Sequence, residues 1–249
     1  MKRSLAFLKR TLVSVLKRSF RTLGYEIVSD SGKYMTMDGG IARLRERKIA
    51  LNSVIDVGAS NGRWTELCMK YFPEATYHLF EAQKEYGSSL ESLRSRYPQI
   101  SYSLCVASDE AGDIYFDDHI VGGGIASREK PDGNFKKMTA STIDKEVTER
   151  GLKGPFLIKL DTHGFEVPIL EGAKETLKQA SVLIIECYNF NLNPTCIKFS
   201  KMVDYLEQRG FSCIDMVDVS LRKSDSVLWQ MDIFFAKSDM DFFSNRSYN

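Results

Sequence analysis

The sequence lacks the cysteine patterns that usually indicate a zinc site or a disulfide framework. Its five cysteines are odd in number, show no C-x-x-C or Cys/His ligand spacing, and mostly lie inside apolar runs. A reduced cysteine packs as a small hydrophobic residue in such runs. We therefore expect a protein of the reducing cytosol without a zinc centre.

The sequence also lacks repeats, low-complexity tracts and Pro/Ser-rich linkers. With 249 residues, 43% apolar and 27% charged, the chain can form one sizeable core. We predict a division near residue 50, with a lead-in segment over residues 1–49 and one α/β domain over residues 50–249.

Motifs for nucleic-acid chemistry and for covalent catalysis are missing as well. After the N-terminal segment there is no basic face interleaved with aromatic residues and no N-P-P-Y-type motif for a flipped base. No Ser/His/Asp or Cys/His set indicates a covalent nucleophile. The sequence therefore favours neither a nucleic-acid partner nor a covalent intermediate.

Charge of one sign is concentrated at the N-terminus. The first 25 residues carry seven basic side chains and no acid, so the remainder of the chain, whose total is +1, has a net charge of about −6. Leucine and phenylalanine recur at helical spacing in this segment, which predicts an amphipathic helix over residues 1–24. It is too polar to span a bilayer and lacks the apolar run and cleavage site of a secretory signal.

Two interpretations of this helix stay open. It could lie on the anionic inner face of a membrane as a peripheral contact of a cytoplasmic protein. Alternatively, it could pack against its own domain or a partner chain. The sequence does not predict the oligomeric state.

After residue 50, strand-like and helix-like runs alternate, which predicts right-handed crossovers and a parallel sheet covered by helices on both faces. The last two strands lack a helix between them and indicate an antiparallel hairpin at one sheet edge. We therefore predict a Rossmann-like, doubly wound, seven-stranded sheet of the methyltransferase type, with a hairpin or loop excursion near 112–128. The predicted strands cover residues 53–58, 75–82, 100–108, 156–161, 181–188, 211–219 and 228–237, and the predicted helices lie near 62–72, 84–96, 166–178 and 197–209.

The segment "VIDVGASNGRWTE" (54–66) indicates a strand, a tight turn and a helix start without the G-x-G-x-x-G spacing of a dinucleotide site. Asp56 lies in the strand end, where a carboxylate repels pyrophosphate but accepts hydrogen bonds from an ammonium group or water. Glu81 ends the next strand, where an acid accepts hydrogen bonds from ribose hydroxyls. A solvated strand-end charge for Glu81 and a helix N-terminal charge for Asp56 are the structural alternatives.

Over roughly residues 34–238, the chain resembles the FkbM-type methyltransferases. The segments that carry this resemblance are, in order along the chain, "VIDVGASNGRWTE", "YHLFEA", "CVASDEAGDIYF", "STID", "FLIKLDTHGFEVPILEGAKETL", "VLIIECY" and "MDIFFAK". The resemblance implies the class I methyltransferase fold, the cofactor S-adenosylmethionine, and a hydroxyl acceptor on a sugar, glycan or polyketide-like small molecule. It implies cofactor contacts in the loop and at the following strand ends. These are Asp56, Gly58, Ala59, Asn61, Gly62 and Glu81, with Ala107 and Ser108 on the adenine side.

Two departures from the family pattern concern the site. The second strand is followed by "FEAQ", where the family often has Phe-Glu-Pro, so the loop after Glu81 lacks a rigid proline. The family commonly has Glu or Gln at the position of His163. This position therefore does not supply an invariant general base.

Three candidate catalytic residues follow the strand "FLIKLD": Asp161, His163 and Glu166. Methyl transfer requires alignment of donor and acceptor and removal of a proton. Asp161 is predicted to orient the acceptor or the methionine end of the cofactor, and His163 to take the proton. The structural alternatives are a surface loop residue for His163 and a helix N-terminal charge for Glu166.

Several features near these residues have two interpretations. Asp161, Glu166 and Glu186 could offer oxygen ligands to a divalent metal, but nothing in the sequence fixes their geometry and no metal site is assigned. Glu186 could face the acceptor, with Tyr188 and Asn189 beside it. The glycine-rich "VGGGIAS" is either a lid or an exposed loop.

Two other function classes are kept as alternatives. A nicotinamide-dependent oxidoreductase would share the strand, the glycine turn and the distant acid. However, this sequence lacks the glycine spacing that such an enzyme uses to bind its cofactor. A catalytically silent methyltransferase-fold protein would bind a partner or a membrane through the basic helix. The presence of Asp56, Gly58, Gly62 and Glu81 together argues against such a loss of activity.

Overall fold

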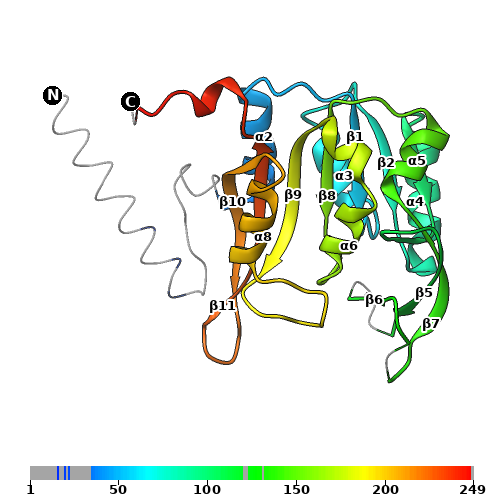
Figure 1. Cartoon of the computed structure of the whole chain (residues 1–249). Helices are drawn as coiled ribbons and strands as arrows, with labels where there is room; N and C mark the ends of the chain where they lie inside the picture. Colours follow the sequence, from blue (N-terminus) through cyan, green and yellow to red (C-terminus); the bar gives the residue numbers. More distant parts are fainter. Residues whose placement is uncertain are drawn as a thin grey trace, which may run out of the picture.

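The computed structural model describes residues 35–119, 123–130 and 132–247, together with Leu16, Phe20 and Thr22. Its centre is a seven-stranded sheet with helices on both faces (Figure 1). The strand order is β10-β11-β9-β8-β1-β2-β3, and all pairings are parallel except those of β11 with β9 and β10. The strands are β1 (Ser53–Val57), β2 (Thr76–Phe80), β3 (Ile100–Ser103), β8 (Phe156–Leu160), β9 (Ala180–Tyr188), β10 (Phe211–Leu221) and β11 (Leu228–Lys237).

The predicted seven-stranded sheet with an antiparallel terminal hairpin is confirmed. The last strand, β11, lies between β9 and β10 rather than at the sheet edge. This order differs from the 3-2-1-4-5-6 order of dinucleotide-binding sheets. It is the class I methyltransferase arrangement that the sequence resemblance implied.

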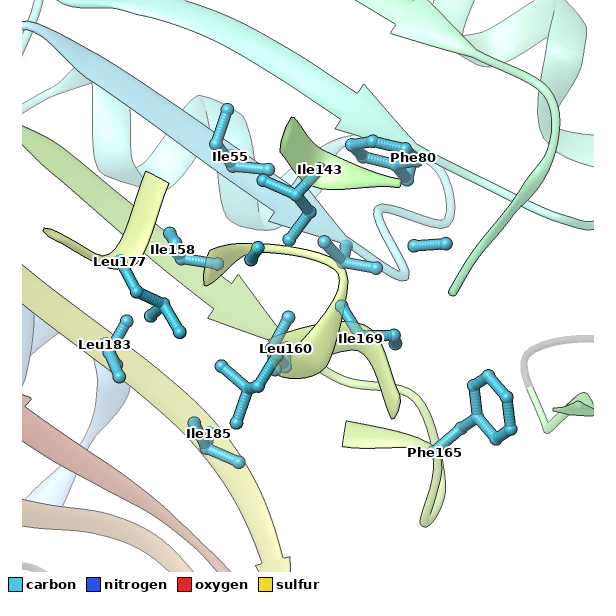
Figure 2. Close-up of a cluster of buried hydrophobic side chains, with 14 of the residues drawn as sticks. Ile55, Phe80, Ile143, Ile158, Leu160, Phe165, Ile169, Leu177, Leu183 and Ile185 are labelled. Carbon is cyan, nitrogen blue, oxygen red and sulfur yellow. The ribbon is translucent and has the colours of Figure 1, made fainter. Parts of the chain in front are cut away.

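Alternation within the buried strands supplies a core on each face of the sheet. In β1, Val54 faces one core while Ile55 and Val57 face the other. Figure 2 shows the second of these cores, where Ile55, Ile158, Leu160 and Ile185 from neighbouring strands meet. Burying each such side chain contributes about 1.5–3 kcal/mol. The two cores therefore fix the sheet register and, with it, the positions of the strand ends.

Helices cover these two cores. On the face drawn in front in Figure 1, α5 (Ile143–Arg150), α6 (Glu166–Glu171) and α8 (Phe199–Glu207) contribute to the core that Figure 2 shows. The opposite core receives side chains from α2 (Met37–Glu46), α3 (Arg63–Met69) and α4 (Gly87–Arg96). The short elements are α7 (Lys174–Lys178), η2 (Lys84–Tyr86) and η3 (Asp241–Phe243).

A second, four-stranded sheet lies beyond the end of the main one, and the sequence prediction was partly wrong here (Figure 1). The single strand expected over 100–108 is two strands, because the chain leaves the main sheet after β3 and joins the second sheet as β4 (Val106–Ala107). The hairpin expected near 112–128 is present as β5 (Gly112–Asp117) and β6 (Ile125–Ser127). The polar strand β7 (Lys136–Ser141) and helix α5 were not predicted.

The helix expected near 166–178 is also divided, into α6 and α7. Gly172 lies at the break, where a Cβ atom would come within 2.0 Å of the carbonyl oxygen of Ser108. The close packing of this turn against the loop after β4 explains why one continuous helix does not form.

The predicted amphipathic helix over residues 1–24 lies outside the described residues, apart from Leu16, Phe20 and Thr22, which are helical. No helix in the described part of the chain is long and apolar enough to cross a membrane. Within the predicted lead-in segment, α2 buries Ile41 and Leu44 completely in the core of the domain.

A buried polar cluster connects β2 to α5. His78 is fully buried, with its Nδ1 atom 2.9 Å from Ser101 Oγ and its Nε2 atom 3.4 Å from Glu146 Oε2. Ser141, Ser103 and Arg150 donate hydrogen bonds to the Glu146 carboxylate. The contact with His78, followed by these serine donors, holds the pKa of Glu146 well below its usual 4.5, and burial lowers the pKa of His78 below 6.5.

We expect this cluster to make the fold sensitive to acid. Both groups bind protons less readily in the folded state, so their contribution is fully present above pH 6.5 and is lost as the pH falls, first for His78 and then for Glu146. Thermal melts from pH 7 to pH 4 should show a steeper fall in Tm for wild type than for His78→Gln, which removes the group that titrates in this range. His119→Gln, which changes an exposed histidine outside the cluster, is the matched control and should follow wild type. Parallel curves for wild type and His78→Gln would contradict this role.

Candidate active site

A cavity of about 250 Å³ lies at the carboxyl ends of β1, β2 and β8 and extends beneath the second sheet. This is the edge of an open parallel sheet where ligands bind. Its polar wall comes from Gly58, Ser60, Glu81, Asp161 and His163. The largely apolar wall includes Phe80, Cys105, Val106, Ala107, Phe116, Ala126, Phe165 and Ile169.

The loop after β1 can approach the cavity because Gly58 has no side chain. Its φ angle is +78°, and a Cβ atom there would lie 2.1 Å from the carbonyl oxygen of Asp161. The amides of Gly58 and Ala59 donate to the carbonyl oxygen of Phe80 at 3.1 Å, which ties the loop to the end of β2. Ser60, with a φ of 50°, turns the chain along the cavity wall.

Glu81 is fixed at the end of β2 by the same loop. Its Oε2 accepts a hydrogen bond of 2.6 Å from the Ser60 amide, and its Oε1 accepts one of 2.7 Å from the Gln83 amide. The residue is 6% exposed and lines the cavity. Burial raises the pKa of Glu81 more than these amides lower it. Each carboxylate oxygen can accept a further hydrogen bond from a hydroxyl group in the cavity.

Asp56 does not line the cavity. It is fully buried behind the loop, where its Oδ2 accepts a hydrogen bond of 2.6 Å from Thr65 and its Oδ1 lies 3.7 Å from Lys159 Nζ. Burial raises the pKa of Asp56 more than the Lys159 charge and the Thr65 bond lower it. The ammonium group that the sequence led us to expect near Asp56 is therefore present, but it belongs to the protein.

Lys159 was missed by the sequence reasoning. Burial by itself lowers its pKa, but the charges of Asp161 and Asp56 outweigh burial and raise it, so the side chain is a buried ammonium. Its Nζ lies 2.9 Å from Asp161 Oδ2. A single lysine inside the apolar strand "FLIKL" was the available signal, because a buried cation requires an acidic partner.

Asp161 and His163, which follow β8, meet Glu186, which lies near the end of β9. One ligand atom from each of the three lies within 4.8 Å of the others. Tyr188 donates a hydrogen bond from its hydroxyl to Glu186 Oε2, and Gln230 donates to Oε1. Burial, helped by the Asp161 charge, raises the pKa of Glu186 to about 8.

A third acid adjoins this group. Asp232 on β11 pairs in register with Glu186 on β9. Burial, together with the Asp161 charge, raises the pKa of Asp232 to about 7. The strand ends therefore carry more acidic groups than Lys159 alone can compensate.

The turn that carries His163 is held from both sides. Glu166, which is 4% exposed and does not line the cavity, accepts hydrogen bonds from the Gly164 amide at 2.9 Å and the Thr162 hydroxyl at 3.1 Å. Asn193 donates to the carbonyl oxygen of His163 at 2.9 Å. His163 itself has a φ of 53°, so these contacts stabilise a backbone conformation that is uncommon outside glycine.

The structure separates the predicted residues into two groups. Gly58, Glu81, Ala107, Asp161 and His163 line the cavity. The residues of the second group do not line the cavity, but several of them shape the neighbouring loops. The Asn61 side chain accepts a hydrogen bond from the Arg63 amide, and the Ser108 hydroxyl donates one to Asp109. This second group consists of Asp56, Ala59, Asn61, Gly62, Ser108 and Glu166.

The cover of the cavity was only partly anticipated. Phe116, Gly124 and Ala126 from the β5–β6 hairpin line it, so the described part of "VGGGIAS" contacts the site rather than forming a remote loop. A Cβ atom on Gly124 would lie 2.1 Å from Phe116 Cζ, which shows how closely the loop packs on the ring. No sequence signal pointed to Phe116, because its partners come from a sheet that was not predicted.

Comparison with solved structures gives distant matches in known methyltransferases. The magnesium protoporphyrin IX methyltransferase of Synechocystis PCC 6803, solved with bound S-adenosylmethionine, is 12% identical and has a TM-score of 0.46 over 81% of this chain and 77% of that one. The precorrin-6y C5,15-methyltransferase of Geobacter metallireducens GS-15 is 11% identical, with a TM-score of 0.43 over 82% and 91%. The N-methyltransferase NodS of Bradyrhizobium japonicum WM9 is 10% identical, with a TM-score of 0.45 over 80% and 93%. No curated protein matches the chain.

The model of the methyltransferase FkbM domain matches residues 56–213, which is more than half of the chain. The cofactor is S-adenosylmethionine. The cavity fits this molecule, because Glu81 offers acceptors for ribose hydroxyls, the largely apolar wall suits an adenine ring, and the space beside Gly58 is open to backbone approach. The resemblance seen in the sequence is thereby confirmed, and the chain belongs to the FkbM methyltransferase domain family.

Proposed function

We propose that the protein transfers the methyl group of S-adenosylmethionine to a hydroxyl group of a sugar, a glycan or a related small molecule. The observation that carries this proposal is the position of Asp161 and His163, which line the same cavity as Glu81. A cofactor held through its ribose by Glu81 would share its cavity with an acid and an imidazole. These are the groups that orientation and deprotonation of a hydroxyl require.

We infer the cofactor contacts from the residues that line the cavity. Glu81 binds the ribose hydroxyls, Gly58 and Ser60 bring backbone close to the methionine part, and Ala107 packs on the adenine side. Ala59, Asn61, Gly62 and Ser108 act by shaping the loops around these contacts. Asp56 acts through Lys159, whose ammonium group it shares with Asp161.

Bound S-adenosylmethionine would supply an electrophilic methyl group for in-line displacement by the acceptor oxygen, with S-adenosylhomocysteine as the leaving group. Asp161 orients the acceptor hydroxyl, and His163 takes its proton. Glu166 stabilises the turn that places His163.

A sugar-like acceptor is supported by the surroundings of Glu186. Tyr188 and Phe190 both pack against Trp229. Their ring centroids lie 6.1 Å and 5.4 Å, respectively, from the Trp229 ring centroid. The C–H faces of a sugar ring pack on such aromatic surfaces, and its hydroxyls bind carboxylates. Glu186, which accepts the Tyr188 hydroxyl, supplies a carboxylate beside these rings, and Asp232 pairs with Glu186 in the sheet.

The test is transfer of labelled methyl from S-adenosylmethionine to a panel of saccharides, with amines and thiols as comparison acceptors. We expect label on a saccharide oxygen, and His163→Ala should lower transfer by about 10²–10⁴-fold while calorimetric binding of S-adenosylmethionine stays within a factor of a few. His119→Ala, which changes an exposed histidine outside this cavity, is the matched control. Cofactor binding without transfer to any hydroxyl would favour the silent binding protein and overturn the proposal.

A further inference from the structure

Asp161, His163 and Glu186 come from two neighbouring elements at one edge of the sheet. Asp161 and His163 follow β8, and Glu186 lies near the end of β9. Their three candidate ligand atoms lie within 4.8 Å of one another. Ligand atoms bonded at about 2.0–2.3 Å to a common centre lie at most about 4.6 Å apart, so the three side chains need to move only slightly closer to bind one ion.

Asp161 and Glu186 are each oriented by a side-chain hydrogen bond that leaves coordinating capacity, and His163 is held through its backbone. Lys159 binds Oδ2 of Asp161, so Oδ1 remains for another partner. Tyr188 and Gln230 each donate to one oxygen of Glu186, and such an oxygen retains a second lone pair. Asn193 holds the backbone of His163 and leaves the imidazole unconstrained by that bond. Orientation of ligands by outer hydrogen bonds is typical of protein metal sites.

The charge balance at this edge favours a cation. Asp161 and Glu186 face each other, with Asp232 beside them. Lys159 serves Asp161 and Asp56, and among the described residues no ion pair within 4 Å reaches Glu186 or Asp232. Two facing carboxylates repel each other unless a proton or a metal cation lies between them, and a metal cation would take the place of that proton.

We propose that Asp161, His163 and Glu186 bind one divalent transition-metal cation, of the Mn²⁺ or Zn²⁺ class. Two carboxylates and one imidazole are a mixed oxygen and nitrogen set that suits these ions better than Mg²⁺ or Ca²⁺, which prefer oxygen alone. The ligand set differs from the one considered from the sequence, because Glu166 points into its own turn and His163 takes its place.

The ion would adjoin the cavity that Asp161 and His163 line. A cation there is positioned to hold the acceptor oxygen as it loses its proton. With the ion bound, the His163 nitrogen that coordinates it cannot also take a proton, so the ion would stabilise the acceptor oxygen while the proton passes to water. The binding of the ion itself does not depend on which acceptor the protein uses.

The test is titration of the full chain with Mn²⁺ followed by electron paramagnetic resonance, and with Zn²⁺ followed by calorimetry, after dialysis against a chelator. We expect one ion per chain, with binding weakened at least about 10-fold in Glu186→Gln and in His163→Gln. Both substitutions approximate the shape of the original side chain, and melting curves confirm that the variants are folded. The controls Glu175→Gln and His119→Gln change exposed residues outside the site and should bind as wild type.

Absence of stoichiometric binding of either ion to wild type would overturn the proposal, and so would unchanged binding in both variants. Terbium luminescence gives a second readout, because the Tyr188 hydroxyl is bonded to Glu186 and its ring would sensitise a bound Tb³⁺ ion. Calorimetry with S-adenosylmethionine in the presence of a chelator separates this outcome from the proposed function. Cofactor binding and methyl transfer in the presence of the chelator would support the methyltransferase proposal independently, so a failed titration would then reject the metal site alone.

Discussion

Replacement of Glu81 by alanine is expected to weaken the binding of S-adenosylmethionine about 100-fold. The carboxylate is 6% exposed and lines the cavity. Two hydrogen bonds from ribose hydroxyls to a charged acceptor contribute together about 3 kcal/mol or more, which corresponds to a factor of 100 or more in the dissociation constant. Calorimetric titration with the cofactor and with S-adenosylhomocysteine measures the change.

Glu81 also accepts hydrogen bonds from the amides of Ser60 and Gln83, so its loss disturbs the loop that we propose faces the methionine part of the cofactor. Glu81→Gln separates the two contributions, because it retains one acceptor oxygen and removes the charge. We expect an intermediate loss of about 10-fold for this variant. Glu85→Ala, an exposed change four residues away, is the control and should bind as wild type. Equal binding by wild type and Glu81→Ala would show that Glu81 has no role in cofactor recognition.

The architecture of the main sheet could be predicted from the sequence because its strands are apolar and separated by helix-length segments. Val54, Ile55 and Val57 in β1 and the run "VLIIECY" in β9 are buried on both faces and show no polar alternation. The second sheet could not be predicted in the same way. Strand β7 is "KKMTAS" and β4 has only two residues, so neither has a hydrophobic pattern that local analysis detects.

The strand-end acids of the site were also predictable, since the carboxyl ends of parallel strands meet at one edge. Their individual surroundings were not, because these depend on register. The pairing of β1 with β8 places Asp56 opposite Lys159, and the pairing of β9 with β11 places Glu186 opposite Asp232. A sequence shows which residues lie at the strand ends, but only the register shows which of these charged side chains lie next to one another.

Replacement of Lys159 by methionine is expected to cost about 3–5 kcal/mol of folding free energy. The ammonium group is buried between Asp56 and Asp161, and methionine fills similar space without a charge. Asp56 would then be a fully buried carboxylate with Thr65 as its one remaining described hydrogen-bond donor. Thermal unfolding should show a decrease in Tm on the order of 10 °C for a chain of this size.

Two comparisons identify the unpaired carboxylate as the cause. Adding Asp56→Asn to Lys159→Met removes the uncompensated charge and should recover part of the lost stability. Lys178→Met breaks an exposed pair with Glu175 and should change stability by less than about 1 kcal/mol.

The pH dependence gives an independent check on the same cause. Burial already raises the pKa of Asp56, and Lys159→Met removes the charge that most lowers it. A group with a raised folded pKa stabilises the fold at low pH and loses that contribution as the pH rises through the folded pKa. The difference in Tm between wild type and Lys159→Met should therefore shrink as the pH is lowered from 7 toward 5. A difference that stays constant over this range, or no recovery in the double variant, would mean that Lys159 stabilises the site through packing rather than through its charge.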